Sequence, residues 1–215
     1  MRGPVLVLVH GLARTRRSML RLAREGEARG YRVVNHGYRS TRETIADHAA
    51  TLGTVIREVD PEAAPLHFVT HSLGGILVRA ALADPATRPR HLGRVVMISP
   101  PNRGSELVDV LGRYRLFHLA MGAAGGALGT TPDSVPNRLG PADYDLGIIT
   151  GDAALNPLFA RWIAGPSDGK VSVERARLDG MRDFLVVARS HSFIMRAPEV
   201  VEAVFRFLET GTFSG

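Results

Sequence analysis

The sequence contains no cysteine. This absence excludes a disulfide framework, and it also excludes any metal site built from thiolate ligands. It does not decide the compartment in which the protein works.

Long apolar runs are missing too. The run at Val5–Val9 is too short to span a membrane, and no small-residue cleavage site follows it. We therefore interpret this run as the first core strand, and we expect neither a signal peptide nor a stable membrane insertion. The expected location is cytoplasmic.

Lysine is nearly absent. Of the 27 basic residues, Lys170 is the one lysine and all the others are arginines, which gives a formal net charge of +6 and a sequence pI of about 10.6. The charge is spread along the chain, with its densest patch at 14–17, and no basic stripe is interleaved with aromatic residues. Net charge affects solubility and non-specific association more than function, so we expect no nucleic-acid partner.

The length and composition are those of a globular protein. The 215 residues are enough for one domain with a substantial core. Hydrophobic residues make up 45% and charged residues 22% of the chain, which argues against disorder. Because no internal repeat or linker is evident, we expect residues 1–215 to form a single domain. The oligomeric state is left open.

Predicted strands and helices alternate along the whole chain. This alternation predicts an α/β fold, with a mainly parallel sheet of about six strands and helices on both faces. Ser40 and Glu43 are expected to form a capping box before the second helix. The predicted strands are 5–9, 31–35, 66–70, 94–99, 146–150 and 184–188, and the predicted helices are 18–29, 45–59, 74–82, 155–163 and 198–210.

A Thr-His-Ser-Leu-Gly-Gly motif at 70–75 lies between a predicted strand and a predicted helix. A serine hydroxyl is a weak nucleophile, so it needs a base beside it and hydrogen-bond donors for an oxyanion. A sharp strand-to-helix turn presents Ser72 outward and leaves the N–H of Leu73 unpaired at the helix N-terminus. The common pattern G-x-S-x-G has a glycine where this chain has Thr70. The motif alone fits an ordinary turn serine equally well.

Polar residues that could take part in catalysis lie after several of the predicted strands. In parallel sheets, ligands bind at the carboxyl ends of the strands. His10 follows the first strand, Ser72 the third, Asp152 or Asp168 the fifth, and His191 the sixth. Serine, aspartate and histidine follow one another in this order in the catalytic triad of α/β-hydrolases.

With these residues in place, the chain resembles the α/β-hydrolase superfamily, in particular its small bacterial lipases and esterases. The resemblance extends from residue 9 to residue 191 and implies a minimal α/β-hydrolase fold with a short lid insertion at 104–145. The segments that carry it are Val9-His10-Gly11-Leu12, His71-Ser72-Leu73-Gly74-Gly75, Pro101-Asn102-Arg103-Gly104-Ser105, Ser167-Asp168-Gly169-Lys170-Val171 and His191.

The resemblance implies that Ser72 is the nucleophile and that His191 is the base. A histidine with a pKa near 6.5 can accept the serine proton and return it to a leaving group. His71 adjoins Ser72 but is expected to point away from it along a strand-like path. The other histidines lack a strand-end position in the required order; they are His36, His48, His67, His91 and His118.

Two aspartates compete for the role of the acid, which must hold the other N–H of the imidazole. Asp168 precedes His191 in an Asp-Gly-x-Val setting similar to the acid loop of the family, while Asp152 directly follows the fifth strand. We favour Asp168, because Asp-Gly permits a tight exposed turn, whereas Asp152 fits equally as a helix N-cap. Asp145 and Asp179 are weaker candidates.

The resemblance further implies an oxyanion hole made by the N–H groups of Leu12 and Leu73, with Gly11 turning the chain and His10 tying down the loop. The implied activity is the hydrolysis of small-molecule carboxylic esters through an acyl-enzyme, without a metal ion or another cofactor. Thioesterases, amidases and acyltransferases use the same machinery. A non-catalytic binding protein with this fold is the alternative from another functional class.

The expected lid, 104–145, is rich in Gly, Pro, Ala and Thr from 122 to 141. Long irregular segments inside compact domains are usually functional lids or disordered. A mobile apolar lid would suit a lipid-like substrate, but an inert surface excursion explains the composition equally well. The apolar residues that could contact an acyl chain are Leu116, Phe117, Leu119, Met121 and Leu128.

Overall fold

The computed structural model describes residues 3–59, 64–155 and 161–214. Within these residues the strands form one parallel sheet of six strands, in the order β2-β1-β3-β4-β5-β6. The mainly parallel, six-stranded sheet expected from the sequence is therefore confirmed. The strands are β1 (Val5–Val9), β2 (Arg32–His36), β3 (Leu66–His71), β4 (Leu92–Ile98), β5 (Leu146–Gly151) and β6 (Asp183–Val187).

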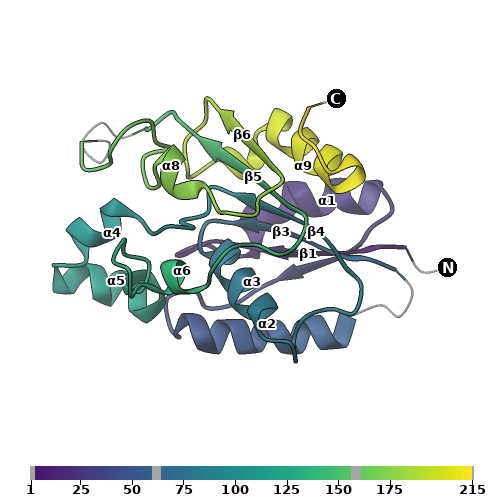
Figure 1. Ribbon diagram of the computed structural model, residues 1–215, viewed down its shortest axis with the longest axis horizontal. Helices are drawn as coiled ribbons and strands as arrows, with labels where there is room; N and C mark the ends of the chain where they lie inside the picture. Colours follow the sequence, from purple (N-terminus) through teal and green to yellow (C-terminus); the bar gives the residue numbers. More distant parts are fainter. Residues whose placement is uncertain (1–2, 60–63, 156–160, 215) are drawn as a thin grey trace.

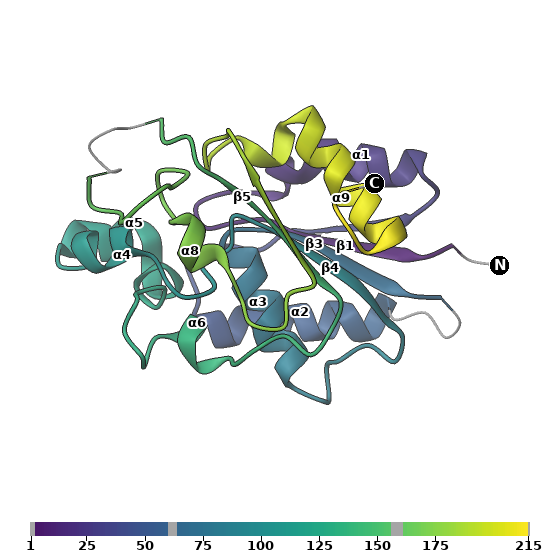
Figure 2. The same cartoon turned by 45° about the horizontal axis from the view of Figure 1, so that its top comes forward.

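Helices cover both faces of the sheet, as Figure 1 shows. One face carries α1 (Leu20–Ala28) and α9 (Pro198–Thr210), and the other carries α2 (Ile45–Val59) and α3 (Leu73–Ala83). Four short helices lie together beyond the carboxyl ends of the strands (Figures 1 and 2). They are α4 (Glu106–Leu111), α5 (Arg115–Gly126), α6 (Val135–Arg138) and α8 (Val173–Ala176).

Strand β1, second from one edge of the sheet, contributes to both halves of the core. All five of its residues are fully buried, as expected for a parallel strand covered on both faces. Leu6 and Leu8 pack among the residues of α1 and α9, whereas Val5, Val7 and Val9 pack among those of α2 and α3. Successive side chains of a strand point to opposite faces, so this one apolar run contributes to both hydrophobic layers.

The capping box predicted at Ser40 and Glu43 is wrong. The N–H of Thr44 donates to Asp47 Oδ2 at 3.1 Å, and the N–H of Asp47 donates to Thr44 Oγ1 at 3.2 Å, so these two residues cap α2 instead. Ser40 Oγ accepts a hydrogen bond from the N–H of Ala13 at 3.0 Å. The Ser40 hydroxyl therefore holds the loop after β1 rather than the start of a helix.

Element boundaries differ from the sequence prediction by a few residues. The predicted helix 18–29 begins as a 3₁₀ turn at Arg16–Met19 before α1 starts. The last helix ends as predicted, since Gly211 adopts a left-handed φ of 84° after it. The predicted helix 155–163 lies largely on 156–160, outside the described residues. No helix in the described parts of the chain is long and apolar enough to cross a membrane.

The segment 104–145 is fixed at its base by a buried arginine. The guanidinium of Arg79, on α3, donates to the carbonyl oxygens of Asn102, Pro136 and Gly140 at 2.8–3.0 Å. Burial lowers the pKa of Arg79 to about 10. A buried charge is stable only when it is well hydrogen-bonded, so these contacts are costly to break. They tie residues near both ends of the segment to α3.

Candidate active site

Ser72 occupies the sharp turn between β3 and α3. Its φ of 53° and ψ of −123° lie in a region that non-glycine residues rarely adopt. Such a conformation costs about 1–3 kcal/mol and persists only where the surrounding structure holds it. Gly74 meets this requirement, because any side chain there would collide with the carbonyl oxygens of Val9 and His10. The start of α3 can therefore pack closely against the end of β1, which helps to hold the turn at Ser72.

Thr70 replaces the usual first glycine of the motif without disrupting the turn. It is fully buried, and a Cβ added at Gly75 would lie only 3.3 Å from its Oγ1. The second glycine of the Gly-Gly pair thus leaves the room that the threonine side chain needs.

The structure brings Ser72, His191 and Asp168 together. Ser72 Oγ lies 3.0 Å from His191 Nε2, and His191 Nδ1 lies 2.8 Å from Asp168 Oδ2. The other carboxylate oxygen, Oδ1, accepts the N–H groups of Lys170 and Val171 at 2.9 Å each. All three side chains are nearly or fully buried. A chain of hydrogen bonds therefore links carboxylate, imidazole and hydroxyl.

The electrostatics keep Asp168 ionised. Burial alone would raise the pKa of its carboxyl group, but the charge and hydrogen bond of His191 and the N–H groups of Val171 and Lys170 outweigh burial, so the pKa is lowered. An ionised carboxylate fixes the imidazole with its Nδ1 proton toward Asp168, which leaves Nε2 free to accept a proton from Ser72.

The alternative acids lie elsewhere. Asp152 directly follows β5, and its N–H donates to the carbonyl of Val187 on β6 at 3.1 Å. Its side chain, however, is exposed. Asp145 and Asp179 form exposed ion pairs with arginines, Asp145 with Arg182 and Asp179 with Arg103. The place beside His191 Nδ1 is taken by Asp168 alone among the described residues.

His71 does not point away from the site as we expected. Its Nε2–H donates to the backbone carbonyl of His191 at 3.0 Å, and the two rings lie 4.9 Å apart. Burial, and secondly the proximity of His191, hold the pKa of His71 well below its usual value, so this ring stays neutral. His71 therefore supports the loop that carries His191, a role that no spacing rule could reveal.

The loop after β1 is held from several sides. His10 Nδ1 donates to the Gly11 carbonyl at 2.9 Å, so His10 does tie down this loop. Tyr38 Oη donates to the His10 carbonyl at 2.7 Å and its ring stacks on the imidazole at 4.2 Å, while Ser40 accepts the Ala13 N–H. Tyr38 is not among the residues predicted for the site, and Ser40 is predicted as a helix cap instead. The signal that could have found them is their place after β2, the neighbour of β1 in the sheet.

A cavity of about 280 Å³ opens over Ser72. The segment 104–145 supplies much of its wall, and the remainder comes from the end of β3 and from the loops after β1, β3, β4, β5 and β6. Its lining residues outside the catalytic groups are predominantly apolar, with Leu12, Leu107, Leu111, Phe117, Met121 and Val171 among them.

Buried histidines beside the site make the fold sensitive to acid. Burial, with His10 and His48 adding repulsion, lowers the pKa of His36 from 6.5 to about 4. As the pH falls from about 6.5 to about 4, the unfolded chain takes up a proton that the folded chain refuses, so the free energy of unfolding decreases by about 1.4 kcal/mol per pH unit from this group.

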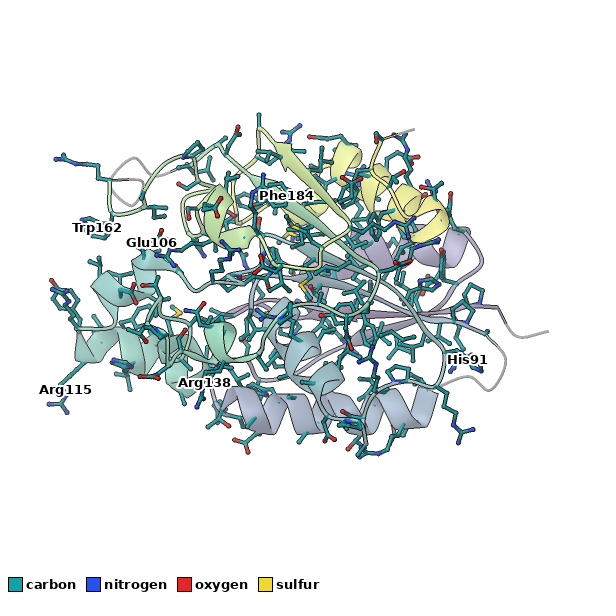
Figure 3. All side chains as sticks on the ribbon, viewed as in Figure 1. His91, Glu106, Arg115, Arg138, Trp162 and Phe184 are labelled. Carbon is teal, nitrogen blue, oxygen red and sulfur yellow. The ribbon has the colours of Figure 1, made fainter. Side chains whose placement is uncertain are left out.

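We expect the His36→Phe variant to escape this loss. The difference in free energy of unfolding between the variant and wild type should therefore change by about 2 kcal/mol in favour of the variant from neutral pH to pH 5. Urea denaturation at both pH values measures this difference. His91→Phe is the matched control, because His91 is exposed at the opposite end of the molecule from α4 and α5 (Figure 3). A pH dependence of His36→Phe equal to that of wild type would contradict the assignment.

Comparisons with known proteins support the same fold. A family model described as "Alpha/beta hydrolase family" matches residues 6–204. The mature form of the lipase BlEst2 from Bacillus licheniformis is similar, with a TM-score of 0.76 and 19% identity over 96% of this chain and 92% of that chain. A metagenomic carboxyl esterase, MGS0156, has a TM-score of 0.70 and 20% identity over 97% of this chain and 76% of that chain.

A third similar structure is the phospholipase PlaB from Legionella pneumophila, with a TM-score of 0.71 and 19% identity. The alignment covers 97% of this chain but only 59% of that chain. A search of curated protein sequences finds no significant match. At these identities the structural similarities establish the fold.

Proposed function

The chain belongs to the alpha/beta hydrolase family, and we propose that it is a serine hydrolase that cleaves carboxylic esters through an acyl-enzyme intermediate. The observation that carries the proposal is the linked arrangement of Ser72 Oγ, His191 and Asp168, with donor–acceptor distances of 3.0 and 2.8 Å. Family membership alone would leave a non-catalytic binding protein equally open, since one fold hosts many functions.

The proposed reaction has two halves. In the first, His191 Nε2 accepts the hydroxyl proton while Ser72 Oγ attacks the ester carbonyl, and the bond to the alcohol oxygen breaks as His191 returns the proton to it. In the second, a water molecule gives a proton to His191 and attacks the acyl carbonyl; the bond to Ser72 Oγ then breaks, His191 returns the proton to Oγ, and the acid leaves. Asp168 holds the imidazole and stabilises its charged form throughout. These steps use only side chains, backbone and water.

The charge that develops on the carbonyl oxygen needs donors, and we assign this role to the N–H groups of Leu12 and Leu73. The N–H of Leu73 lies in the first turn of α3, where it has no partner within the helix. Leu12 lines the cavity next to Ser72, and its loop is fixed by His10, Tyr38 and Ser40. Donors that are already held in position act without reorganisation, which is why they are effective.

Replacing Gly11 by alanine tests the loop. A Cβ at Gly11 would lie 2.9 Å from His71 Nδ1 and 3.0 Å from Ser72 Cβ, so the loop and the N–H of Leu12 must move away. We expect kcat for a p-nitrophenyl ester to fall by about 10²–10³, the usual cost of losing one such donor. Gly37→Ala is the control, because its Cβ would make only ordinary contacts, the nearest at 3.5 Å. Equal kcat in both variants would argue against Leu12.

The apolar lining of the cavity supports an ester with an aliphatic or aromatic acyl group as substrate. The similar structures bear the names of a lipase, a phospholipase and a carboxyl esterase, which agrees with esters as the substrate class. Thioesters and amides react by the same steps. A p-nitrophenyl ester series of increasing chain length, with and without micelles, measures the acyl preference and tests whether 104–145 acts as a lid.

Labelling with a fluorophosphonate probe tests the proposed function directly. We expect the wild-type protein to be labelled once, with the adduct located on Ser72 by mass spectrometry of peptides, because only an activated serine reacts quickly with such probes. A denatured sample serves as the control for non-specific reaction. Labelling no faster than in the denatured control, or an adduct on another residue, would refute the proposal.

A further inference from the structure

The cavity over Ser72 has two walls of different chemistry. One is apolar and comes mainly from the segment 104–145, the part of the chain that contains α4 and α5 (Figure 2). The other carries two cations, Arg14 from the loop after β1 and Lys170 from the loop that carries Asp168. Among the described residues that line the cavity there is no aspartate or glutamate. The cavity is therefore amphiphilic, and its polar part has one sign of charge.

Neither cation has a carboxylate partner among residues 3–59, 64–155 and 161–214. Arg14 donates one hydrogen bond, to the Ser192 carbonyl at 3.3 Å, and Lys170 forms no side-chain hydrogen bond or ion pair in these ranges. Although part of Lys170 is exposed, desolvation and the charge of Arg14 lower the pKa of its ammonium, against the opposing effect of Asp168. Two like charges held together repel each other, and an anion between them would relieve the repulsion.

The two cations come from loops that contact the loop of His191 and its carboxylate partner. Arg14 is bonded to the residue next to His191, and the backbone N–H of Lys170 is bonded to the carboxylate that holds His191. The leaving alcohol receives its proton from His191 Nε2, so it must lie on that side of the ester carbonyl. The acyl group then extends toward the apolar wall.

We propose that the preferred substrate is an ester of an apolar acyl chain with an alcohol that carries a phosphate group, and that Lys170 and Arg14 bind this phosphate. The inference rests on the proposed ester hydrolysis and specifies its substrate class. A guanidinium offers paired donors to phosphate oxygens, and an ammonium offers a compact charge, so together they suit a dianion. The phosphate itself is not cleaved. It leaves attached to the alcohol, whose oxygen takes the proton from His191.

The test compares monooctanoylglycerol with its phosphate monoester, which differ in charge but not in the acyl chain or the ester bond. We expect wild type to hydrolyse the phosphate ester with a kcat/KM at least tenfold higher, mostly through a lower KM. This preference should fall to near unity in Lys170→Met and Arg14→Gln and should return in Lys170→Arg. The Lys170 variants keep the backbone contacts of residue 170 with Asp168 and Ser105.

Arg17→Gln is the matched control, since it removes the same charge from an exposed arginine near Arg14 that does not line the cavity. We expect it to keep the full preference. A purely structural role of Lys170 would change kcat/KM for both esters equally, and that result would overturn the proposal. Equal kcat/KM of wild type for the phosphate ester and the uncharged ester, in soluble and in membrane-embedded form alike, would overturn it as well.

The phosphate could belong to a soluble molecule or to a lipid headgroup. The octanoyl esters, used as monomers, represent the soluble form. The corresponding palmitoyl esters, embedded in phosphatidylcholine vesicles, represent the lipid form. A preference for the phosphate ester in either form supports the proposal, and the form with the larger ratio identifies the source.

A binding measurement separates this proposal from the proposed hydrolysis. Ser72→Ala keeps the cavity but lacks the nucleophile, so calorimetry with n-octyl phosphate and n-octanol reports recognition alone. We expect octyl phosphate to bind at least tenfold more tightly, and this difference to vanish in the Ser72→Ala, Lys170→Met double variant. If no ester is hydrolysed but octyl phosphate binds in this way, the hydrolase function fails and the anion site stands. If the two ligands bind equally, the anion site fails.

Discussion

Ser72→Ala is expected to lower kcat for a p-nitrophenyl ester by about 10⁶, the scale seen when the nucleophile of a serine triad is removed. The reason is specific to the acyl-enzyme route: without Oγ, the imidazole of His191 at 3.0 Å has no proton to accept from the protein. The activity that survives would come from the oxyanion donors and from substrate binding alone, which act on any nucleophile, including water.

Ser99→Ala provides the control for Ser72→Ala. Ser99 follows the neighbouring strand β4, is fully buried and also has a positive φ, 49°, but its hydroxyl has no hydrogen-bond partner among the described residues. Its replacement by alanine should leave kcat within a few-fold of wild type. Comparable kcat values for the two variants, in steady-state assays on folded protein, would mean that Ser72 is not the nucleophile.

The fold and the serine could be predicted because both follow from local rules. Continuous apolar runs identified the strands, and the carboxyl ends of parallel strands share one edge of the sheet, so Ser72 and His191 had to approach each other. Strand position alone did not separate Asp152 from Asp168; the Asp-Gly turn favoured Asp168, but its place beside His191 follows from the folded loop. This place depends on the turn that carries Asp168, where Gly169 takes a φ of 93° and Ser167 pairs with Ser172.

The supporting contacts were beyond prediction for a related reason. Tyr38 and Ser40 contact the loop after β1 from a neighbouring loop, and His71 contacts a carbonyl 120 residues away. Periodicity and spacing describe neighbours along the chain, whereas these contacts depend on the final packing of several loops. The wrong capping prediction shows the same limit, since Ser40 satisfied the local pattern but bonded to Ala13 instead.

Asp168→Asn is expected to lower kcat by about 10⁴ with little change in the fold. The asparagine Oδ1 can still accept the N–H groups of Lys170 and Val171, but its amide group would donate to His191 Nδ1. The imidazole would then carry its proton on Nε2, the tautomer that cannot accept the proton of Ser72. Asp152→Asn should leave kcat near that of wild type, because its carboxylate is exposed and away from the imidazole.

The same substitution in a Ser72→Ala background separates a catalytic role of Asp168 from a structural one. If Asp168 acts only by keeping His191 in the right tautomer to activate Ser72, then adding Asp168→Asn to Ser72→Ala should cost almost nothing further, because the residues of a triad act as a unit. A structural role would instead lower the residual activity again and reduce the free energy of unfolding in both backgrounds. A larger loss of kcat in Asp152→Asn than in Asp168→Asn would move the acid to Asp152.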